Sequence, residues 1–397
     1  MRIMTRLSAV QAAYGILGGA YLPFFAASLA SRGLSASAIG FLLALATFLR
    51  ILISPLAGLV ADARDDRRLV MLVFTLAAFI AFVVLVFVQD TDDIFLAAVF
   101  GVVLWSSTSP ILESVTLKAA ERSGLSYGAV RVWLSIAFVG SNVVCGLLVS
   151  QLGFLVVAPW LAFSCGFQLW GIYALPASER DNPAGSFGPH FRATFAEARE
   201  LLGKPVFLVF LTVCSLIQGS HVVYYTYAGL IWREQGMNAA VIGLIWPLGV
   251  IAEILLFVFS ARVVRRIDPV MLIGIGAAAC AMRWTMMAFD PGSFLLLIAQ
   301  LLHGLTFAVP HLGAMYFILR ATPPRLSATA QSLYSVAIGL ISSVALLPAG
   351  HLYGEWGAQI YLLMSIMAVL ASLLNLLLRK GWSGGRLTEK PAPTGAA

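Results

Sequence analysis

Long apolar segments follow one another along almost the whole chain, separated by short polar stretches. A helix that spans a membrane needs about 20 mostly apolar residues, and the chain offers twelve segments of this kind. They cover residues 7–30, 37–61, 69–89, 94–118, 128–151, 154–175, 205–230, 239–261, 269–289, 293–319, 327–350 and 356–378. The pattern predicts an all-α integral membrane protein with twelve transmembrane helices.

A polar stretch at residues 177–204 divides these segments into six and six. Its prolines and glycines, such as Pro183 and Gly185, are typical of a linker, and residues 191–202 within it are expected to form a short surface helix. We expect four regions: an N-terminal six-helix half (1–176), a cytoplasmic linker (177–204), a C-terminal six-helix half (205–380) and a disordered cytoplasmic tail (381–397).

The two halves carry a repeat. Residues 33–40 align with residues 236–243 at an offset of 203, and at this offset Arg50 falls on Glu253. Both lie inside apolar segments, where a charge is costly and marks a functional site by default. Two halves of the same orientation with a polar site at mid-membrane depth describe the architecture of major facilitator transporters. We therefore expect two pseudo-symmetric six-helix halves.

Composition and charge support a membrane location. The chain is 60% hydrophobic and 11% charged, whereas soluble domains carry about 25% charged residues. Of its 25 Lys and Arg residues, Arg32 and Arg233 fall on one side, Arg50, Arg131 and Arg283 fall inside apolar segments, and the others lie on the side that holds both termini. Positive loops are cytoplasmic, so both termini are expected in the cytoplasm and the protein in the inner membrane.

Several classes of function are disfavoured. The excess of 7 positive charges is spread over short loops, so no nucleic-acid partner is expected. The four cysteines lie in apolar segments without metal-ligand spacing and are expected to be free thiols. No P-loop or catalytic set is present, so we expect no enzyme, no cofactor and no metal. Residues 7–30 are too long for the apolar core of a signal peptide and are taken as the first membrane helix.

Polar residues recur at helical spacing within the apolar segments, which places them on shared faces. These sets are Trp105, Ser109 and Glu113; Arg131, Ser135, Phe138 and Asn142; Gln218, His221 and Tyr225; Trp246, Gly249 and Glu253; and His303, Phe307 and His311. A buried charge needs a partner or a water-filled cavity, so Glu113 is expected to pair with Arg131 and Glu253 with Arg283. A carboxylate that loses such a partner takes up a proton, which would couple protons to transport.

Some of these residues have a second interpretation. Arg50 is equally compatible with a structural contact between two helices and with contact to substrate. Arg131 lies near the cytoplasmic end of its segment and could extend to the membrane surface, although the polar face that continues to Asn142 favours a site. His303 alone would suit packing, and its alignment with His311 favours a site.

A second motif lies between the second and third segments. Gly58 and Asp62, followed by Arg64, Arg67 and Arg68, resemble the signature at this position in the major facilitator superfamily. That resemblance implies a gating role, with glycine allowing close helix approach and Asp and Arg forming a charge relay. Asp65 and Asp66 replace the usual glycine here. A simple positively charged loop would explain the arginines but not Gly58 and Asp62.

Several motifs together resemble the phenylpropionate permease family, a bacterial branch of proton-coupled symporters near the oligosaccharide and nucleoside symporters. They are residues 127–138, 218–225 and 249–253, Arg283 with Trp284, and His303 with His311. The resemblance covers essentially the whole chain. It implies uptake of a small organic solute with protons, with Glu113 and Arg131 facing the substrate in the first half, and His221, Glu253, Arg283 and His311 binding substrate or carrying the proton in the second.

The sequence therefore favours a proton-driven importer of an anionic aromatic or similar small organic acid that works by alternating access. A proton symporter of a sugar or nucleoside is the alternative, a proton-driven efflux antiporter is third, and a receptor or scaffold would not need matched buried charges. The expected substrate-binding residues are Glu113, Arg131, Gln218, His221, Tyr225, Trp246, Arg283, His303, Phe307 and His311. Those for proton coupling are Glu253, Glu113 and His311, and those for gating or structure are Arg50, Gly58, Asp62, Arg64 and Arg67. The expected partners are a small molecule, protons and the lipid bilayer, and a monomer suffices.

Overall fold

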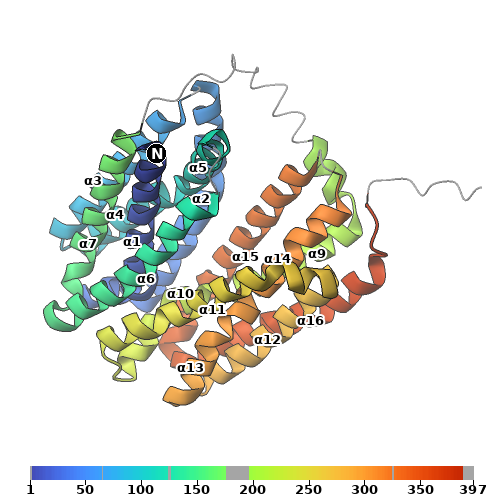
Figure 1. Cartoon of the computed structure of the whole chain (residues 1–397). Helices are drawn as coiled ribbons and strands as arrows, with labels where there is room; N and C mark the ends of the chain where they lie inside the picture. The colour runs from blue at the N-terminus through green and yellow to red at the C-terminus, as the bar shows by residue number, and fades with distance from the viewer. Residues whose placement is uncertain (1, 65, 124–126, 176–195, 324–325, 388–397) are drawn as a thin grey trace, which may run out of the picture. The chain divides into compact units, whose positions relative to one another are not determined.

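A computed structural model describes residues 2–64, 66–123, 127–175, 196–323 and 326–387 (Figure 1). The side chains of 2–3, 59, 62–64, 120–123 and 258–265 are not among those described. Most of the predicted linker and the end of the predicted tail lie outside these ranges. Residues 196–202, at the end of the expected surface helix, are helical.

Every regular element in the described ranges is a helix. The first part of the chain forms α1 (Arg2–Ser31), α2 (Ala36–Arg64), α3 (Arg67–Phe87), α4 (Thr91–Ser107), α5 (Ser109–Ser123), α6 (Tyr127–Leu152), η1 (Phe154–Val156) and α7 (Val157–Tyr173). The second forms α9 (Pro205–Gly219), α10 (Val222–Glu234), α11 (Ala239–Arg266), α12 (Pro269–Ala288), α13 (Ser293–Leu301), η2 (Gly304–Ala308), α14 (Val309–Ala321), α15 (Ser327–Trp356), η4 (Gly357–Ile360) and α16 (Tyr361–Gly381).

Eleven helical stretches in the described residues are long and apolar enough to cross a membrane. Ten of them correspond to the first ten segments that the sequence predicts. The eleventh, Ser327–Gly381, is 55 residues long and contains α15, η4 and α16 without interruption. The chain is therefore a multi-pass helical membrane protein.

The structure divides into two compact units. Unit 1 comprises Met1–Phe187, Val222–Ile251 and Ser342–Ile360, and unit 2 comprises Gly188–His221, Ala252–Ile341 and Tyr361–Ala397. Helices α11 and α15 each contribute one part to each unit.

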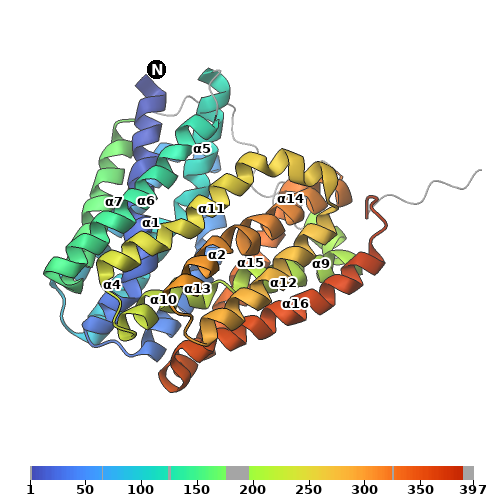
Figure 2. The same ribbon diagram turned by 60° about the horizontal axis from the view of Figure 1, so that its bottom comes forward.

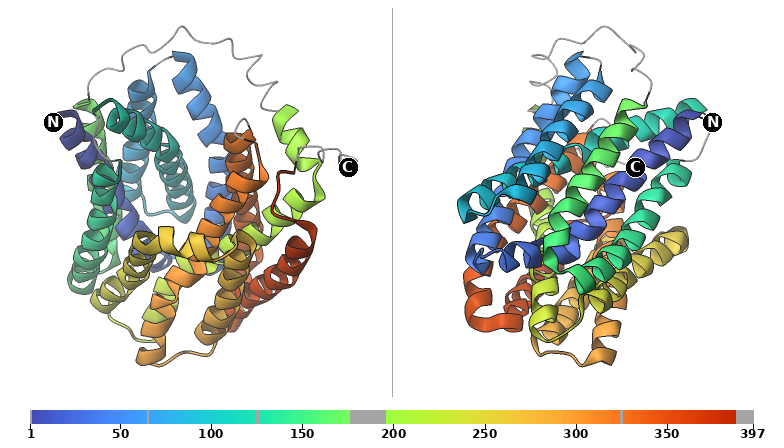
Figure 3. Two further views of the ribbon diagram at one scale, coloured as in Figure 1. Left: turned by 45° about the vertical axis from the view of Figure 1, so that its right-hand side comes forward. Right: turned by 90° about the vertical axis from the view of Figure 1, so that its left-hand side faces the viewer.

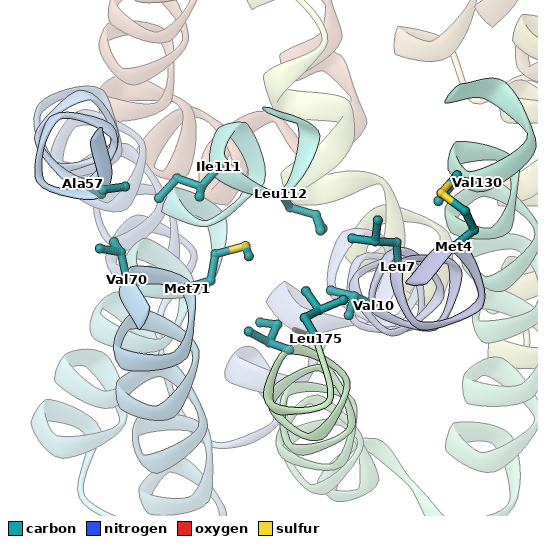
Figure 4. Packing of buried hydrophobic residues seen from close by; sticks show 12 residues of the cluster. Met4, Leu7, Val10, Ala57, Val70, Met71, Ile111, Leu112, Val130 and Leu175 are labelled. Atoms are coloured by element: carbon teal, nitrogen blue, oxygen red, sulfur yellow. The ribbon is translucent and has the colours of Figure 1, made fainter. Parts of the chain in front are cut away.

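In unit 1, α1 packs against both α6 and α7 (Figure 3, right). One end of this packing is a cluster of buried apolar side chains from α1, α2, α3, α5, α6 and the end of α7 (Figure 4). It contains Leu7, Val10, Met71, Leu112 and Leu175. Burial of such side chains stabilises the unit by roughly 1.5–3 kcal/mol each in aqueous terms, and in lipid their contribution is close packing.

Unit 1 also contains a very close helix approach between α6 and α11. A Cβ atom added to Gly243 would collide with the backbone oxygen of Asn142, so only glycine fits there. The hydroxyl of Tyr227 on α10 donates to the backbone oxygen of Ala36 at 3.0 Å. Small residues that let backbones approach are typical of helix contacts in membranes.

In unit 2, α12 packs against α16 and α14, and α16 packs against α9 (Figure 2). The side chain of Asn375 on α16 donates to the backbone oxygen of Val270 on α12 at 3.1 Å. After α16 the chain turns back, and the buried ring of Trp382 lies 4.7 Å from that of Phe317 on α14. Leu387 then donates its backbone N–H to the backbone oxygen of Ala321.

The sequence repeat is also a repeat of local geometry. Gly33 and Gly236 both adopt a positive φ, 94° and 82°, which favours glycine. Three residues later α2 begins at Ala36 and α11 at Ala239. Positions 203 residues apart therefore share the same local structure, a turn at a glycine followed by the start of a helix.

The cytoplasmic motif is only partly described. The side chains of Asp62 and Arg64 lie outside the described set, and Arg67 begins α3. Asp66 caps α3 by accepting from the backbone N–H of Leu69 at 2.9 Å. A Cβ atom on Gly58 would meet no described atom within 4 Å, and the close helix approach expected at Gly58 stays a prediction.

The four cysteines match the expectation of free thiols. Cys145, Cys165, Cys214 and Cys280 are all buried and form no disulfide. Each lies within an apolar helix or beside one, and none is exposed by more than 1%.

Candidate functional site

Glu113 on α5 is held by two residues of α6 in unit 1. The Nε atom of Arg131 donates to one carboxylate oxygen at 2.8 Å, and the hydroxyl of Tyr127 donates to the other. The side chains of Arg131 and Glu113 remain 36% and 32% exposed. The predicted ion pair is therefore present, and it is only partly buried.

An aromatic wall lies beside this pair. The ring of Tyr14 stacks on Trp105 with centroids 4.7 Å apart, and Tyr21 lies 5.6 Å from the same indole. The hydroxyl of Tyr14 is within electrostatic reach of Arg50, Glu113 and Arg131. Arg50 also reaches Tyr21 electrostatically. Flat ring faces and two cations thus share one region of unit 1.

Two helix breaks build the polar region of unit 2. The predicted continuous segment 205–230 is interrupted between α9 and α10, where Ser220 and His221 leave the helix. Ser220 accepts from the indole N–H of Trp284 on α12 at 2.9 Å. The Nδ1 atom of His221 lies 3.0 Å from the backbone oxygen of Ile217. The break therefore turns a buried imidazole toward α12.

The second break is a π-helical turn, η2, between α13 and α14. Pro310 lacks a backbone N–H and cannot serve the carbonyl group four residues before it. That carbonyl, of Thr306, accepts instead from the thiol of Cys280 at 3.5 Å. The next one, of Phe307, accepts from the side-chain amide of Gln218 at 3.2 Å. Turns of this kind occur often at functional sites.

Arg283 is the centre of this region. Its side chain is fully buried, and Nη1 lies 3.0 Å from Nδ1 of His303 and 3.2 Å from the hydroxyl oxygen of Thr306. The guanidinium also lies over the ring of Trp284, 4.6 Å from its centroid. A buried cation needs several such partners, and here they come from α12 and from the break at η2.

Glu253 joins the network through His303. The carboxylate of Glu253 on α11 lies 3.8 Å from Nε2 of His303. The expected pair of Glu253 and Arg283 is thus bridged by an imidazole that contacts each of them with a different ring nitrogen. Because a guanidinium can only donate, Nδ1 of a neutral His303 accepts and Nε2 carries the hydrogen, on the side of Glu253.

Aromatic rings extend from His303 along α14. His303 stacks on Phe307 at 5.3 Å, Phe307 on His311 at 6.4 Å, and Nδ1 of His311 lies 3.2 Å from the hydroxyl of Tyr334 on α15. The predicted face of His303, Phe307 and His311 is confirmed as a face.

Two predicted site residues lie elsewhere, in unit 1. Trp246 is buried and stacks on Tyr224 at 4.8 Å, with Trp232 at 5.7 Å. Tyr225 contacts Tyr224 with centroids 5.6 Å apart. These contacts form an aromatic packing cluster, and a role for Trp246 and Tyr225 in binding stays a prediction.

Three polar residues of these sites were missed by reading the sequence alone. Thr306 and Tyr334 each resemble the many Thr and Tyr residues that only pack in a helix. Tyr127 had a usable signal, because it lies four residues before Arg131 and so shares its face. In the described residues no group of three or more His, Cys, Asp or Glu side chains could hold a metal ion.

Comparison with known proteins places these features in context. The sequence model of the MFS_1 like family matches residues 10–364. The chain is 28% identical over 368 residues to the "Probable 3-phenylpropionic acid transporter" of Escherichia coli (strain K12), covering 90% of this chain and 93% of that protein. It is 28% identical over 367 residues to the maltose permease of Geobacillus stearothermophilus, covering 91% of each.

The fold has a similar counterpart among solved structures. The crystal structure of the nucleoside transporter NupG matches with a TM-score of 0.77 at 16% identity, covering 96% of this chain and 100% of that one. At this identity the likeness concerns the fold. The relatives and the structural neighbour are membrane transporters and not enzymes.

Proposed function

The chain belongs to the MFS_1 like family, and on that premise we propose that it is a proton-coupled symporter for a small organic acid, with an aromatic carboxylate such as 3-phenylpropionate as its substrate. It works in the inner membrane, with twelve transmembrane helices in two halves and both termini in the cytoplasm. Transport follows alternating access, in which the polar sites face one side of the membrane and then the other.

One observation carries the proposal of proton coupling. His303 contacts a permanently charged guanidinium with Nδ1 and a carboxylate with Nε2, at 3.0 and 3.8 Å. A carboxylate inside a membrane protein is tolerated only when it is paired or protonated, so a change at Arg283 or His303 changes the proton occupancy of Glu253. Glu253 is therefore the coupling residue that we propose, with His303 as its relay.

The substrate class rests on the cations and rings of unit 1. A guanidinium binds oxyanions through two donors, so a substrate carboxylate suits Arg131. The side chain of Arg131 is 36% exposed, whereas that of Arg283 is buried. The stacked Tyr14 and Trp105 offer flat faces to an aromatic ring. The relative from Escherichia coli bears the name of a transporter for an aromatic acid, which supports the same class.

A sugar is the second candidate. The maltose permease is as similar to the chain as the aromatic-acid transporter, and Glu113 with Gln218 would suit hydroxyl groups. A sugar symporter would use the same proton relay, so substrate class and coupling can be tested in one experiment.

The experiment uses the full chain in liposomes with a weakly buffered external solution. External pH is recorded on addition of 3-phenylpropionate, cinnamate, a nucleoside or maltose, for the wild type, Glu253→Gln and Glu355→Gln. Glu355 is the matched control, because it is half exposed and pairs with His351 one turn away.

We expect alkalinisation with an aromatic acid for the wild type and Glu355→Gln, and none for Glu253→Gln. Exchange of labelled for unlabelled substrate, which needs no net proton movement, should persist in Glu253→Gln. Alkalinisation with maltose alone would replace the substrate class and keep the coupling. An unchanged proton signal in Glu253→Gln would overturn the role of Glu253.

A further inference from the structure

The hydroxyl of Thr306 lies where three elements of unit 2 meet. The side chain is fully buried in the π turn η2. Its oxygen lies 3.2 Å from Nε2 of His221, 3.2 Å from Nη1 of Arg283 and 3.3 Å from the backbone oxygen of His303. One hydroxyl hydrogen thus has two acceptors within reach, and one cation donates to the oxygen.

The direction of these hydrogen bonds can be assigned. A backbone oxygen only accepts, so Nδ1 of His221 donates to Ile217 and Nε2 of the neutral ring is an acceptor. Arg283 only donates. The hydroxyl of Thr306 therefore accepts from Arg283 and donates to Nε2 of His221.

A second arrangement exists at the same heavy-atom positions. If His221 gains a proton on Nε2, both of its nitrogens donate. The hydroxyl hydrogen of Thr306 then rotates about the Cβ–Oγ bond toward the backbone oxygen of His303, and the hydroxyl oxygen accepts from His221. The proton on Nε2 comes from a hydronium ion of the bulk solution, whose O–H bond breaks as the N–H bond forms and which leaves as water.

The charges around this hydroxyl decide which arrangement forms. Arg283 from α12 and His303 face it directly, Glu253 from α11 contacts His303, and the Cys280 thiol occupies the backbone oxygen of Thr306. A positive guanidinium beside His221 opposes a second positive charge. Burial of His221 opposes the charge as well, and an anion that neutralises Arg283 removes the part of the opposition that comes from the guanidinium.

We propose that Thr306 is a positioning residue that couples Arg283 to His221, so that binding of an anionic substrate at Arg283 lets His221 take up a proton. The proposal rests on the proposed function, because it assumes that the anionic substrate, first held by the exposed Arg131, reaches Arg283 during the alternating-access cycle, although Arg283 is buried in the conformation described. It adds a second proton acceptor to the pair formed by Glu253 and His303.

The test compares Thr306→Val, which has the same shape without the hydroxyl, with Thr306→Ser, which keeps it. The primary readout is the side-chain ¹⁵N spectrum of the histidines in the purified full-length protein, with His221 assigned from His221→Gln. With only 5 histidines in the chain, each imidazole can be assigned, and the spectrum reports the tautomer without any need for transport.

For the wild type and Thr306→Ser we expect a neutral His221 with hydrogen on Nδ1, which becomes protonated when 3-phenylpropionate is added. For Thr306→Val we expect the response of His221 to the acid to be lost. Uptake should fall by about tenfold, the usual effect of one hydrogen bond to a charged group. The pH profile of uptake by Thr306→Val should match that of His221→Gln, and the double variant should lose no more uptake than either single variant.

Two outcomes overturn the proposal. One is a His221 signal that responds equally in Thr306→Val and the wild type. The other is an equal loss of uptake at every pH with an unchanged histidine spectrum, which is a structural effect. If Thr306→Val does not fold, Thr306→Ala is measured in the same way. A wild type that moves no protons but shows the spectral response would separate failure of symport from failure of this coupling.

Discussion

Arg283 and His303 are joined by a hydrogen bond of 3.0 Å between Nη1 and Nδ1, and this bond determines which nitrogen of the neutral imidazole carries the hydrogen. Since a guanidinium only donates, Nδ1 of His303 accepts for as long as this bond is in place. The opposite ring nitrogen is therefore the one presented to Glu253. The buried guanidinium of Arg283 on α12 thus determines that His303 presents an N–H group to the carboxylate of Glu253 on α11.

Arg283→Lys tests whether charge alone is enough. A lysine keeps the charge but presents one nitrogen on a flexible stem instead of a planar fork, so it should not serve both His303 and Thr306. We expect uptake to fall by about tenfold or more. Arg32→Lys is the control, because Arg32 donates to the backbone oxygens of Leu85 and Val88. Uptake that is unchanged in Arg283→Lys, or equally reduced in both variants, would contradict this role.

Tyr127→Phe removes one of the two partners of Glu113 and leaves the ring in place. The pair of Glu113 and Arg131 is one-third exposed, so we expect a cost in stability below about 1 kcal/mol. We expect a several-fold rise in KM for uptake with little change in melting temperature, because the carboxylate loses its fixed position. Tyr173→Phe, at a side chain exposed by 70%, serves as the control. A normal KM in Tyr127→Phe would remove the pair from the binding site.

Gly243→Ala tests the close approach of α11 to α6. The added methyl group would collide with the backbone oxygen of Asn142, so the two helices must separate. Gly140→Ala on α6 is the control, since a Cβ there meets no described atom within 4 Å. We expect Gly243→Ala to lower the melting temperature and the uptake rate. Gly140→Ala should be neutral or stabilising by a few tenths of a kcal/mol to about 1 kcal/mol. Equal behaviour of the two would show that the approach is dispensable.

Trp382→Ala tests the segment that follows α16. The indole is buried, lies 4.7 Å from Phe317 and donates to the backbone oxygen of Gly385 at 2.7 Å. Truncating a buried Trp costs about 3 kcal/mol or more, so the melting temperature in detergent should fall by about 5–10 °C. Uptake per folded molecule should persist. Trp356→Ala, at a side chain exposed by 49%, should change the melting temperature much less.

Much of the fold follows from the sequence because lipid allows few alternatives. Backbone groups in a bilayer must be satisfied within the segment, so a long apolar stretch is a helix. The repeat at Gly33 and Gly236 could be read from the printed residues, and the structure gives both the same positive φ. The ion pair of Glu113 and Arg131 was also predictable, since a buried charge needs a partner.

The interruptions of the helices could not be predicted in the same way. The chain around Gly219 and Pro310 resembles ordinary membrane helix, in which glycine and proline are common. The breaks exist because Trp284, Cys280 and Gln218 supply hydrogen bonds from elsewhere in the fold. The importance of Thr306 depends on those breaks and has no local signal.

The burial of the four native cysteines makes this chain a convenient starting point for site-specific labelling. A membrane-impermeant maleimide has no access to thiols that are exposed by 1% or less. A single cysteine introduced at an exposed position would therefore be the dominant point of attachment for a fluorophore or spin label. Distances between two such labels would test the proposed alternating access, without first replacing any of the native cysteines.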